Sequence, residues 1–349
     1  MKTDILIVGS GCSGLYAALN LPEELDIMLI TKSDFESSDS FLAQGGMCTL
    51  KDPSDYDSFF EDTLKAGHYE NDRKSVEIMI KSSPDVVKDL VKYGASFTRD
   101  ENGDFVYTRE GAHAHHRILF HEDVTGKEIT SHLLDAVKKL KNVRMYEYTT
   151  LLDILYDGNK CCGGIIRWPD GREEQVEADY VILATGGIGG TYKHSTNFKH
   201  LTGDGVEIAK RHNIELKNLD YVQIHPTTLY SDNKEERSFL ISESVRGEGA
   251  RLYDKNMNRF VDELLPRDLL TQEIYKQMEK DGTDFVWEDL RTIPRDELIS
   301  HFPNIIEHCS QAGYDVFNEC IPIVPAQHYF MGGIKVNHNS KTSMDHLYA

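Results

Sequence analysis

Three glycines near the start of the chain have the spacing of a dinucleotide-binding turn. Gly9, Gly11 and Gly14 form the pattern GxGxxG between an apolar run that predicts a strand and a stretch that predicts a helix. In such a turn the first glycine permits the bend, the second lets the backbone approach a pyrophosphate, and the third lets the helix pack on the strand. Free N–H groups at the helix N-terminus then favour phosphate. We expect a dinucleotide here, and the strand–turn–helix–strand context disfavours the alternative of an ordinary glycine turn.

The residues after the second predicted strand argue against a nicotinamide cofactor. An NAD site requires an acidic residue there for the ribose hydroxyls, and this chain has Ile30, Thr31 and Lys32. A second glycine-rich segment, ATGG at residues 184–187, follows another predicted strand. A long dinucleotide that runs over the sheet edge needs such a second segment of bare backbone. FAD therefore fits better than NAD.

Two histidines and one arginine could contact an anionic ligand. His225 precedes Pro226, which keeps it in extended backbone, and His328 stands shortly before a pair of glycines. Imidazole N–H groups can donate to carboxylates, although a buried histidine bonded to a backbone carbonyl is the alternative for each. Arg267 begins a predicted helix, where a cation opposes the helix dipole. Helix stability does not favour arginine there, so we expect a ligand-binding role rather than a solvated surface arginine.

The overall charge limits the partners of the chain. Its 349 residues carry 38 Lys and Arg against 58 Asp and Glu, a net charge of −20 that repels nucleic acid and anionic membrane surfaces. An anionic ligand must therefore meet a local cluster of cations. Because no apolar run is long enough to span a bilayer and the N-terminus does not resemble a secretion signal, we expect a cytoplasmic protein with reduced cysteines.

Periodicity predicts an α/β fold that positions these residues. After residue 221 the predicted elements become short and mixed. This change predicts a second domain at 222–331 inserted into a first domain made of 1–221 plus 332–349. Strands are predicted at 4–8, 26–31, 143–148 and 180–187, with a β-ribbon that turns at 169–171, and helices at 13–21, 54–66, 73–93, 126–139 and 205–212.

Nine short motifs in this order resemble the flavoprotein family of succinate dehydrogenase, fumarate reductase and L-aspartate oxidase. They are GSGCSG, AQGG, REGAH, ATGG, TGDG, HPT, RGEGA, PRD and HYFMGG. The resemblance implies a Rossmann-like FAD-binding domain with an inserted α+β capping domain. The loop TREGAHAHHRILFHEDVTGKEI is similar to that of the L-aspartate oxidase branch. Family members continue beyond the last motif into a helical C-terminal domain, which we expect to be absent from this chain.

The resemblance implies an FAD site built from several segments. Its residues would be Gly9, Ser10, Gly11, Cys12, Ser13 and Gly14 at the pyrophosphate, Lys32 after the second strand, Ser40, Ala43, Gln44, Gly45 and Gly46 along the flavin, and Ala184, Thr185, Gly186 and Asp204. Asp39 stands where membrane-bound relatives carry a histidine linked to the flavin. Because a carboxylate cannot form that linkage, we expect non-covalent FAD.

By the same resemblance, the substrate is a small dicarboxylate or amino acid. Arg267 would transfer a proton or stabilise charge, and His225 and His328 would bind carboxylates. Further substrate contacts would come from Gln44, Ser242, Glu243 and Arg246. Glu110 would pair with an ammonium group, which aspartate has and fumarate and succinate lack, whereas a solvated loop carboxylate is the alternative.

The resemblance implies oxidation of L-aspartate to iminoaspartate, with the Cα hydride passing to flavin N5 and electrons to O₂ or fumarate. This is the first step towards quinolinate and NAD, and it implies transfer of the product to quinolinate synthase. The alternatives are a soluble fumarate reductase or succinate-oxidising flavoprotein, and a shortened flavin-binding chain with little turnover.

Three histidines between residues 113 and 116 could suggest a metal. No cysteine or carboxylate spacing nearby completes a four-ligand zinc site around His113, His115 and His116. We therefore expect no metal, and we expect these histidines to make hydrogen bonds around flavin and substrate.

Overall fold

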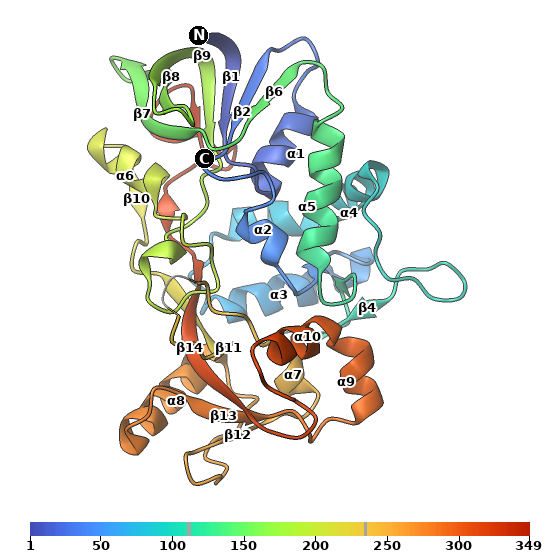
Figure 1. Cartoon of the computed structure of the whole chain (residues 1–349). Helices are drawn as coiled ribbons and strands as arrows, with labels where there is room; N and C mark the ends of the chain where they lie inside the picture. The colour runs from blue at the N-terminus through green and yellow to red at the C-terminus, as the bar shows by residue number, and fades with distance from the viewer. Residues whose placement is uncertain (110–112, 234–235) are drawn as a thin grey trace.

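The elements of the chain gather around two sheets at opposite ends of the molecule (Figure 1). The computed structural model describes residues 1–109, 113–233 and 236–349. The larger sheet has the order β6-β2-β1-β9-β8-β7, and β16 pairs with β9. Its strands are β1 (Lys2–Val8), β2 (Ile27–Ile30), β6 (Val143–Tyr146), β7 (Thr150–Asp157), β8 (Lys160–Arg167), β9 (Glu173–Leu183) and β16 (Leu347–Tyr348).

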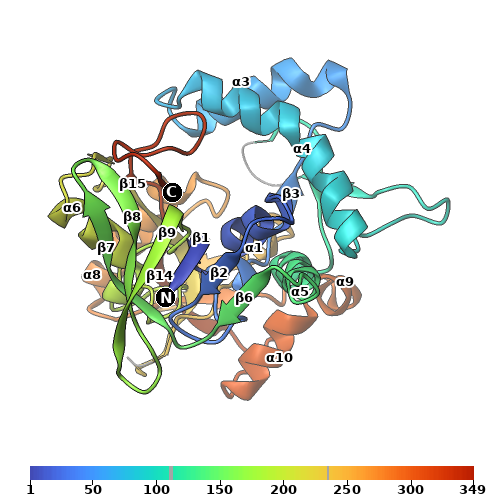
Figure 2. The ribbon, with the colours of Figure 1, turned by 90° about the horizontal axis from the view of Figure 1, so that it is seen from above.

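The central strands are apolar on both faces because both faces are covered. Ile5 and Ile7 of β1 pack in one core cluster, which includes residues of α1 (Cys12–Asn20) and α5 (Thr125–Val137). Leu6 and Val8 pack in another, which includes residues of the β7–β8 ribbon and of α6 (Asp204–Arg211). Figure 2 shows α1 and α5 on one side of β1 and the ribbon on the other. This burial explains why β1 and β2 read as unbroken apolar runs.

Strand β9 differs from the prediction. The sequence predicts a strand at 180–187, but β9 spans Glu173–Leu183. Its first half pairs antiparallel with β8 and its second half pairs parallel with β1. The residues from Glu173 to Asp179 alternate between exposed and buried, so they lack the apolar run that marks the second half. The ATGG segment that follows is not strand and has no regular secondary structure.

The helical hairpin before the His-rich loop matches the prediction. Helix α4 spans Arg73–Tyr93, as predicted, because Asp72 caps it by accepting from Ser75 N (2.8 Å) and Gly94 ends it with φ +111°. Helix α3 (Tyr56–Ala66) follows a short 3₁₀ turn, η1 (Pro53–Asp55), and packs on α4. Nearby lie α2 (Asp39–Leu42), β3 (Met47–Cys48), β4 (Tyr107–Thr108) and β5 (Ile118–Leu119).

The second sheet has the order β11-β14-β13-β12 and draws all its strands from residues 222–330. Its strands are β11 (Val222–Leu229), β12 (Arg251–Tyr253), β13 (Val286–Asp289) and β14 (Ile321–Phe330). Around it lie α7 (Glu243–Gly247), α8 (Arg267–Asp281), α9 (Arg295–His301) and α10 (Pro303–Gln311). The link to the larger sheet includes η2 (Gly189–Thr191) and the pair β10 (Leu216–Lys217) and β15 (Gly333–Ile334). The two-domain boundaries remain a prediction.

Within the described ranges, no helix is both long and apolar enough to cross a membrane. None of the six cysteines, all of which lie in the described ranges, is in a disulfide.

Candidate active site

A cavity of about 1010 Å³ is lined by residues of both sheets and their loops. It runs from the glycine turn between β1 and α1, past residues 184–187, to the side chains of His225, Arg267 and His328. Its volume is at the upper end of the usual range for ligand sites, about 300–1,000 Å³. The cavity therefore joins the predicted dinucleotide turn to the predicted carboxylate-binding residues.

The glycine turn has the backbone geometry that its spacing predicts. Gly9 has φ +118°, and a Cβ there would lie 2.0 Å from the carbonyl oxygen of Ala184. A Cβ on Gly14 would lie 2.0 Å from the carbonyl oxygen of Gly9. Gly9 thus permits the bend and the approach of the ATGG segment, while Gly14 lets α1 pack against the strand end.

The N-terminus of α1 is suited to a phosphate. Gly11 is its N-cap residue and supplies no side-chain cap, and the first turn has no acidic residue. Cys12 N donates to Ser40 Oγ (3.1 Å). The remaining N–H groups of the first turn and the helix dipole favour an anion at this end of the cavity. The turn therefore fits the diphosphate of FAD.

An acidic group reaches the end of β2 from elsewhere in the chain. Lys32 Nζ donates to Asp204 Oδ2 and to Thr202 Oγ1, each at 2.8 Å. Asp204 begins α6, and both it and Lys32 line the cavity. The carboxylate that the sequence lacks after β2 is thus supplied by the TGDG segment.

Most predicted cofactor residues line the cavity. They are Gly9, Ser10, Gly11, Ser13, Lys32, Ser40, Ala43, Gln44, Gly45, Ala184, Thr185, Gly186 and Asp204. Cys12, Gly14 and Gly46 differ, because none of them is part of the lining. The thiol of Cys12 turns towards α5, where it contacts Thr130 Oγ1 (3.2 Å). Gly14 and Gly46 are sites of close backbone packing, since a Cβ on Gly46 would lie 2.3 Å from Leu119 O.

Arg267 is held by two side chains at the far end of the cavity. Its Nε donates to Glu243 Oε2 (2.5 Å) and its Nη1 donates to Gln223 Oε1 (2.8 Å). Arg267, Glu243 and Ser242 all line the cavity. This leaves Nη2 of Arg267 for a ligand, and arginine keeps its charge at any physiological pH.

His225 and His328 lie edge to face, with ring centroids 5.2 Å apart. Nδ1 of His225 lies 3.0 Å from Thr227 O and 3.2 Å from Thr227 N, and Nδ1 of His328 lies 2.8 Å from Thr196 Oγ1. Nε2 of each ring thus remains for a ligand. Burial, aided by the charge of Arg267, lowers the pKa of His225 well below its usual range and that of His328 to about 4. Both rings are therefore neutral at neutral pH.

Arg246 differs from the other predicted substrate-binding residues. Arg246, expected to contact substrate, is not in the lining; it is 2% exposed and donates from Nη1 to the backbone oxygen of Glu263 (2.7 Å). Glu243, on the same helix, lines the cavity, whereas Arg246 is buried, and a substrate contact of Arg246 remains a prediction. Glu110 lies outside the described residues.

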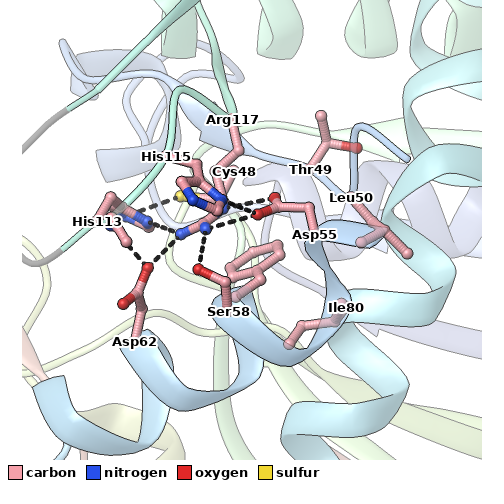
Figure 3. A network of polar contacts seen from close by, with 12 residues as sticks. Cys48, Thr49, Leu50, Asp55, Ser58, Asp62, Ile80, His113, His115 and Arg117 are labelled. Carbon is pink, nitrogen blue, oxygen red and sulfur yellow. Dashed lines mark hydrogen bonds and ion pairs between the residues drawn. The ribbon is translucent and has the colours of Figure 1, made fainter. Parts of the chain in front are cut away.

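The histidines of residues 113–116 differ from the prediction that they surround the flavin and the substrate. His113, His115 and His116 do not line the cavity. Instead, Figure 3 shows His113 and His115 in a network around Arg117, whose side chain is fully buried. Arg117 donates to both oxygens of Asp55 (2.8 Å each) and to Asp62 Oδ2 (2.6 Å). His113 Nδ1 lies 3.0 Å from Arg117 Nη1, and His115 Nδ1 lies 2.7 Å from Asp55 Oδ1. The network fastens this segment to α3.

The sequence did not single out several residues that line or shape the cavity. Gln223 orients Arg267, and Thr196 contacts His328. Arg237 lines the cavity, and its positive charge favours the ionised form of Asp39. Burial raises the pKa of Asp39 to about 6, against the hydrogen bond from Phe198 N and the charge of Arg237. Gln223 stands two residues before His225, which was a usable signal, whereas Arg237 is in no motif.

Known proteins agree with this arrangement. Residues 4–349 match the family described as FAD binding domain. The chain is 49% identical over 346 residues to an L-aspartate oxidase of Clostridium perfringens, covering 99% of this chain and 78% of that protein. The chain belongs to the L-aspartate oxidase family of FAD-dependent oxidoreductases.

Further relatives agree. Another L-aspartate oxidase, of Clostridium acetobutylicum, is 43% identical over 349 residues, covering 100% of this chain and 80% of its own length. Among solved structures, an Escherichia coli quinol fumarate reductase mutant matches with a TM-score of 0.91 at 28% identity. This chain is covered in full, and it spans 64% of that reductase chain. As a member of the L-aspartate oxidase family, the chain thus has the FAD-binding fold of the fumarate reductase flavoproteins.

Proposed function

We propose that this chain uses non-covalent FAD to oxidise L-aspartate to iminoaspartate. The observation that carries the proposal is the single cavity in which the glycine turn, His225, His328 and Arg267 all take part. FAD, when bound, supplies the acceptor for a hydride, which carries two electrons. The chain itself supplies binding and alignment.

The substrate end of the cavity suits a C4 dicarboxylate. Neutral His225 and His328 can each donate one hydrogen bond when protonated at Nε2, and Arg267 offers a permanent positive charge. Because Glu243 and Gln223 hold Nε and Nη1 of Arg267, the guanidinium has a fixed orientation. An arginine with a pKa above about 12 is a poor general base, so its role is to pair with a carboxylate and stabilise charge.

Selectivity for aspartate rests on the ammonium group. Glu110 is the residue to which the resemblance gives this role, and a carboxylate there would reject diacids that lack a cation. Non-covalent FAD rests on Asp39, which lines the cavity and accepts from Phe198 N (3.1 Å). Transfer of the product to quinolinate synthase remains a prediction.

The alternative activity is the interconversion of succinate and fumarate. His225, His328 and Arg267 suit any C4 dicarboxylate, and this observation favours the alternative as a second candidate. A steady-state assay separates the two: we expect L-aspartate to produce hydrogen peroxide in air, or to drive fumarate reduction anaerobically. Peroxide from succinate but not from L-aspartate would contradict the proposal.

A further inference from the structure

A buried glutamate and a buried arginine interact electrostatically in the part of the chain that forms the second sheet. Glu288 is on β13 and is fully buried, and Arg246 is on α7 and is 2% exposed. Glu288 is two residues from Val286, a member of the core cluster of the second sheet. Residues two apart in a strand share a face, so Glu288 occupies a position where an apolar side chain is expected. Burying a carboxyl group there is costly unless the group has a compensating partner.

The hydrogen bonds of this pair are incomplete. Both oxygens of Glu288, and Nε and Nη2 of Arg246, have no hydrogen-bond partner among the described residues. The nearby Glu263 cannot serve Arg246 with its carboxylate, which accepts from Leu252 N and from Arg259. Two donors and two acceptors are thus left in the same part of the core. Buried polar atoms are nearly always bonded in folded proteins, so an unbonded set of this kind indicates a site that binds a proton or a bridging water.

The charge on Arg246 also acts on the cavity. Arg246 interacts electrostatically most strongly with Glu288 and next with Glu243. It also acts on Arg267 and on His225. Glu243 and Arg246 are three residues apart on α7, which places them on one face of the helix. The state of Glu288 therefore determines how much of the charge of Arg246 is felt by the residues that bind carboxylates.

We propose that Glu288 is a buried proton-binding residue that sets the positive potential at the substrate end of the cavity through Arg246. This inference deepens the proposed function and rests on it. With Glu288 protonated, the charge of Arg246 is uncompensated and favours a dicarboxylate. With Glu288 ionised, the two charges cancel and dicarboxylate binding weakens.

The titration of Glu288 places this change above neutral pH. Burial raises the pKa of Glu288 to about 8; the charge of Arg246 opposes the rise and that of Glu263 adds to it. The other titratable group that Glu288 influences is Cys309, whose pKa burial raises to about 12. The carboxyl group is therefore neutral at pH 7 and ionises in the alkaline range.

The first test measures fumarate binding to the FAD-loaded full chain by perturbation of the flavin spectrum. From about pH 7 to about pH 9.5 we expect the Kd of fumarate to rise by about tenfold in the wild-type chain. Glu288→Gln, which is permanently neutral, should keep a flat Kd, and so should Glu288→Leu. Glu297→Gln, an exposed change on α9, is the matched control and should behave as wild type. The same alkaline rise in both Glu288 variants would overturn the inference.

The second test needs no ligand. Because the folded pKa of Glu288 lies above that of an unfolded glutamate, the folded chain holds an extra proton between about pH 4.5 and pH 8. The urea midpoint of the wild-type chain should therefore fall with rising pH in this range, relative to both variants. Coinciding pH profiles would overturn the inference, as would failure of fumarate to bind at any pH. A Glu288-dependent profile in a chain that L-aspartate does not reduce would contradict the proposed function alone.

Discussion

Arg267 and Glu243 form a 2.5 Å ion pair at the end of the cavity where His225 and His328 meet. Gln223 holds a second nitrogen of the same guanidinium. The pair thus fixes the guanidinium of Arg267 in a single orientation, with Nη2 left for substrate. This geometry makes Arg267 the residue whose replacement should affect the reaction most.

Arg267→Lys should lower kcat/KM for L-aspartate by about ten- to a hundredfold, while the Kd of FAD stays the same. Lysine keeps the charge but cannot contact Glu243, Gln223 and a carboxylate with a planar fork, and losing a charged hydrogen bond costs about 1.5–3 kcal/mol. Steady-state kinetics and flavin titration measure the two quantities. Lys276→Arg, an exposed change on α8, serves as the control. Unchanged kcat/KM in Arg267→Lys would contradict the assigned role.

Glu110→Gln should weaken the use of L-aspartate by about ten- to a hundredfold and leave the Kd of fumarate nearly unchanged. Fumarate has no ammonium group to pair with Glu110, and a charged hydrogen bond is worth about 1.5–3 kcal/mol. This prediction rests on the sequence alone. Glu101→Gln, in the exposed part of the same region, is the control. Equal losses for the two ligands would mean that Glu110 has a structural role.

His328 should make the chain less stable as the pH falls. Its folded pKa, about 4, lies below its unfolded value, so the unfolded chain binds the extra proton between about pH 6.5 and pH 4. Stability from this group is complete above pH 6.5, and about 3 kcal/mol should be lost by pH 4. His328→Gln should remove this part of the slope when urea unfolding is measured from pH 4.5 to pH 7.5. An identical slope in the variant would refute the assignment of a neutral buried ring.

Arg117→Met should destabilise the fold by about 3–5 kcal/mol, because Asp55 and Asp62 would lose their buried counter-charge. Urea unfolding measures the change. The matched control is Arg172→Met, which removes an exposed pair with Asp170 and should leave the midpoint within error. If both variants unfold alike, the network of Figure 3 contributes no more than a surface ion pair.

Acid precipitation should release all the flavin into the supernatant. Asp39 offers a carboxylate where a histidyl linkage would need an imidazole, and its hydrogen bond from Phe198 N holds it beside the cavity. Absorbance of pellet and supernatant after denaturation gives the result. Flavin that stays with the pellet would show a covalent bond.

Local sequence patterns predicted those helices and turns whose ends and buried faces are determined by neighbouring residues. The helix Arg73–Tyr93 was predicted to the residue because its apolar period lies between Asp72 and Gly94, which cap it. The glycine turn was predicted because the spacing of its glycines is local, although a Cβ on Gly9 would meet Ala184 O, from a distant part of the chain. The start of β9 was missed because its first half has one exposed face and pairs with a ribbon, not with the parallel core.

The cavity residues that belong to sequence motifs were predicted. Those that only tertiary packing brings to the cavity were missed. His225, His328 and Arg267 were found, but their partners Thr196 and Gln223 come from other strands and loops. Arg246 was placed in the cavity because it lies in the same short segment as Glu243, yet only Glu243 lines the cavity and Arg246 is buried beneath it. The histidines of residues 113–116 were assigned to the flavin because nothing in the sequence reveals that Arg117 and α3 bind two of them.

The most direct test of the account is anaerobic reduction of the FAD-loaded chain by L-aspartate. The account predicts that L-aspartate bleaches the yellow flavin absorption completely and that succinate, which has no ammonium group, does so far more slowly. Oxaloacetate and ammonia are the hydrolysis products of iminoaspartate. One of each should appear for every flavin that is reduced. A flavin that stays oxidised with L-aspartate but is bleached by succinate would contradict the account.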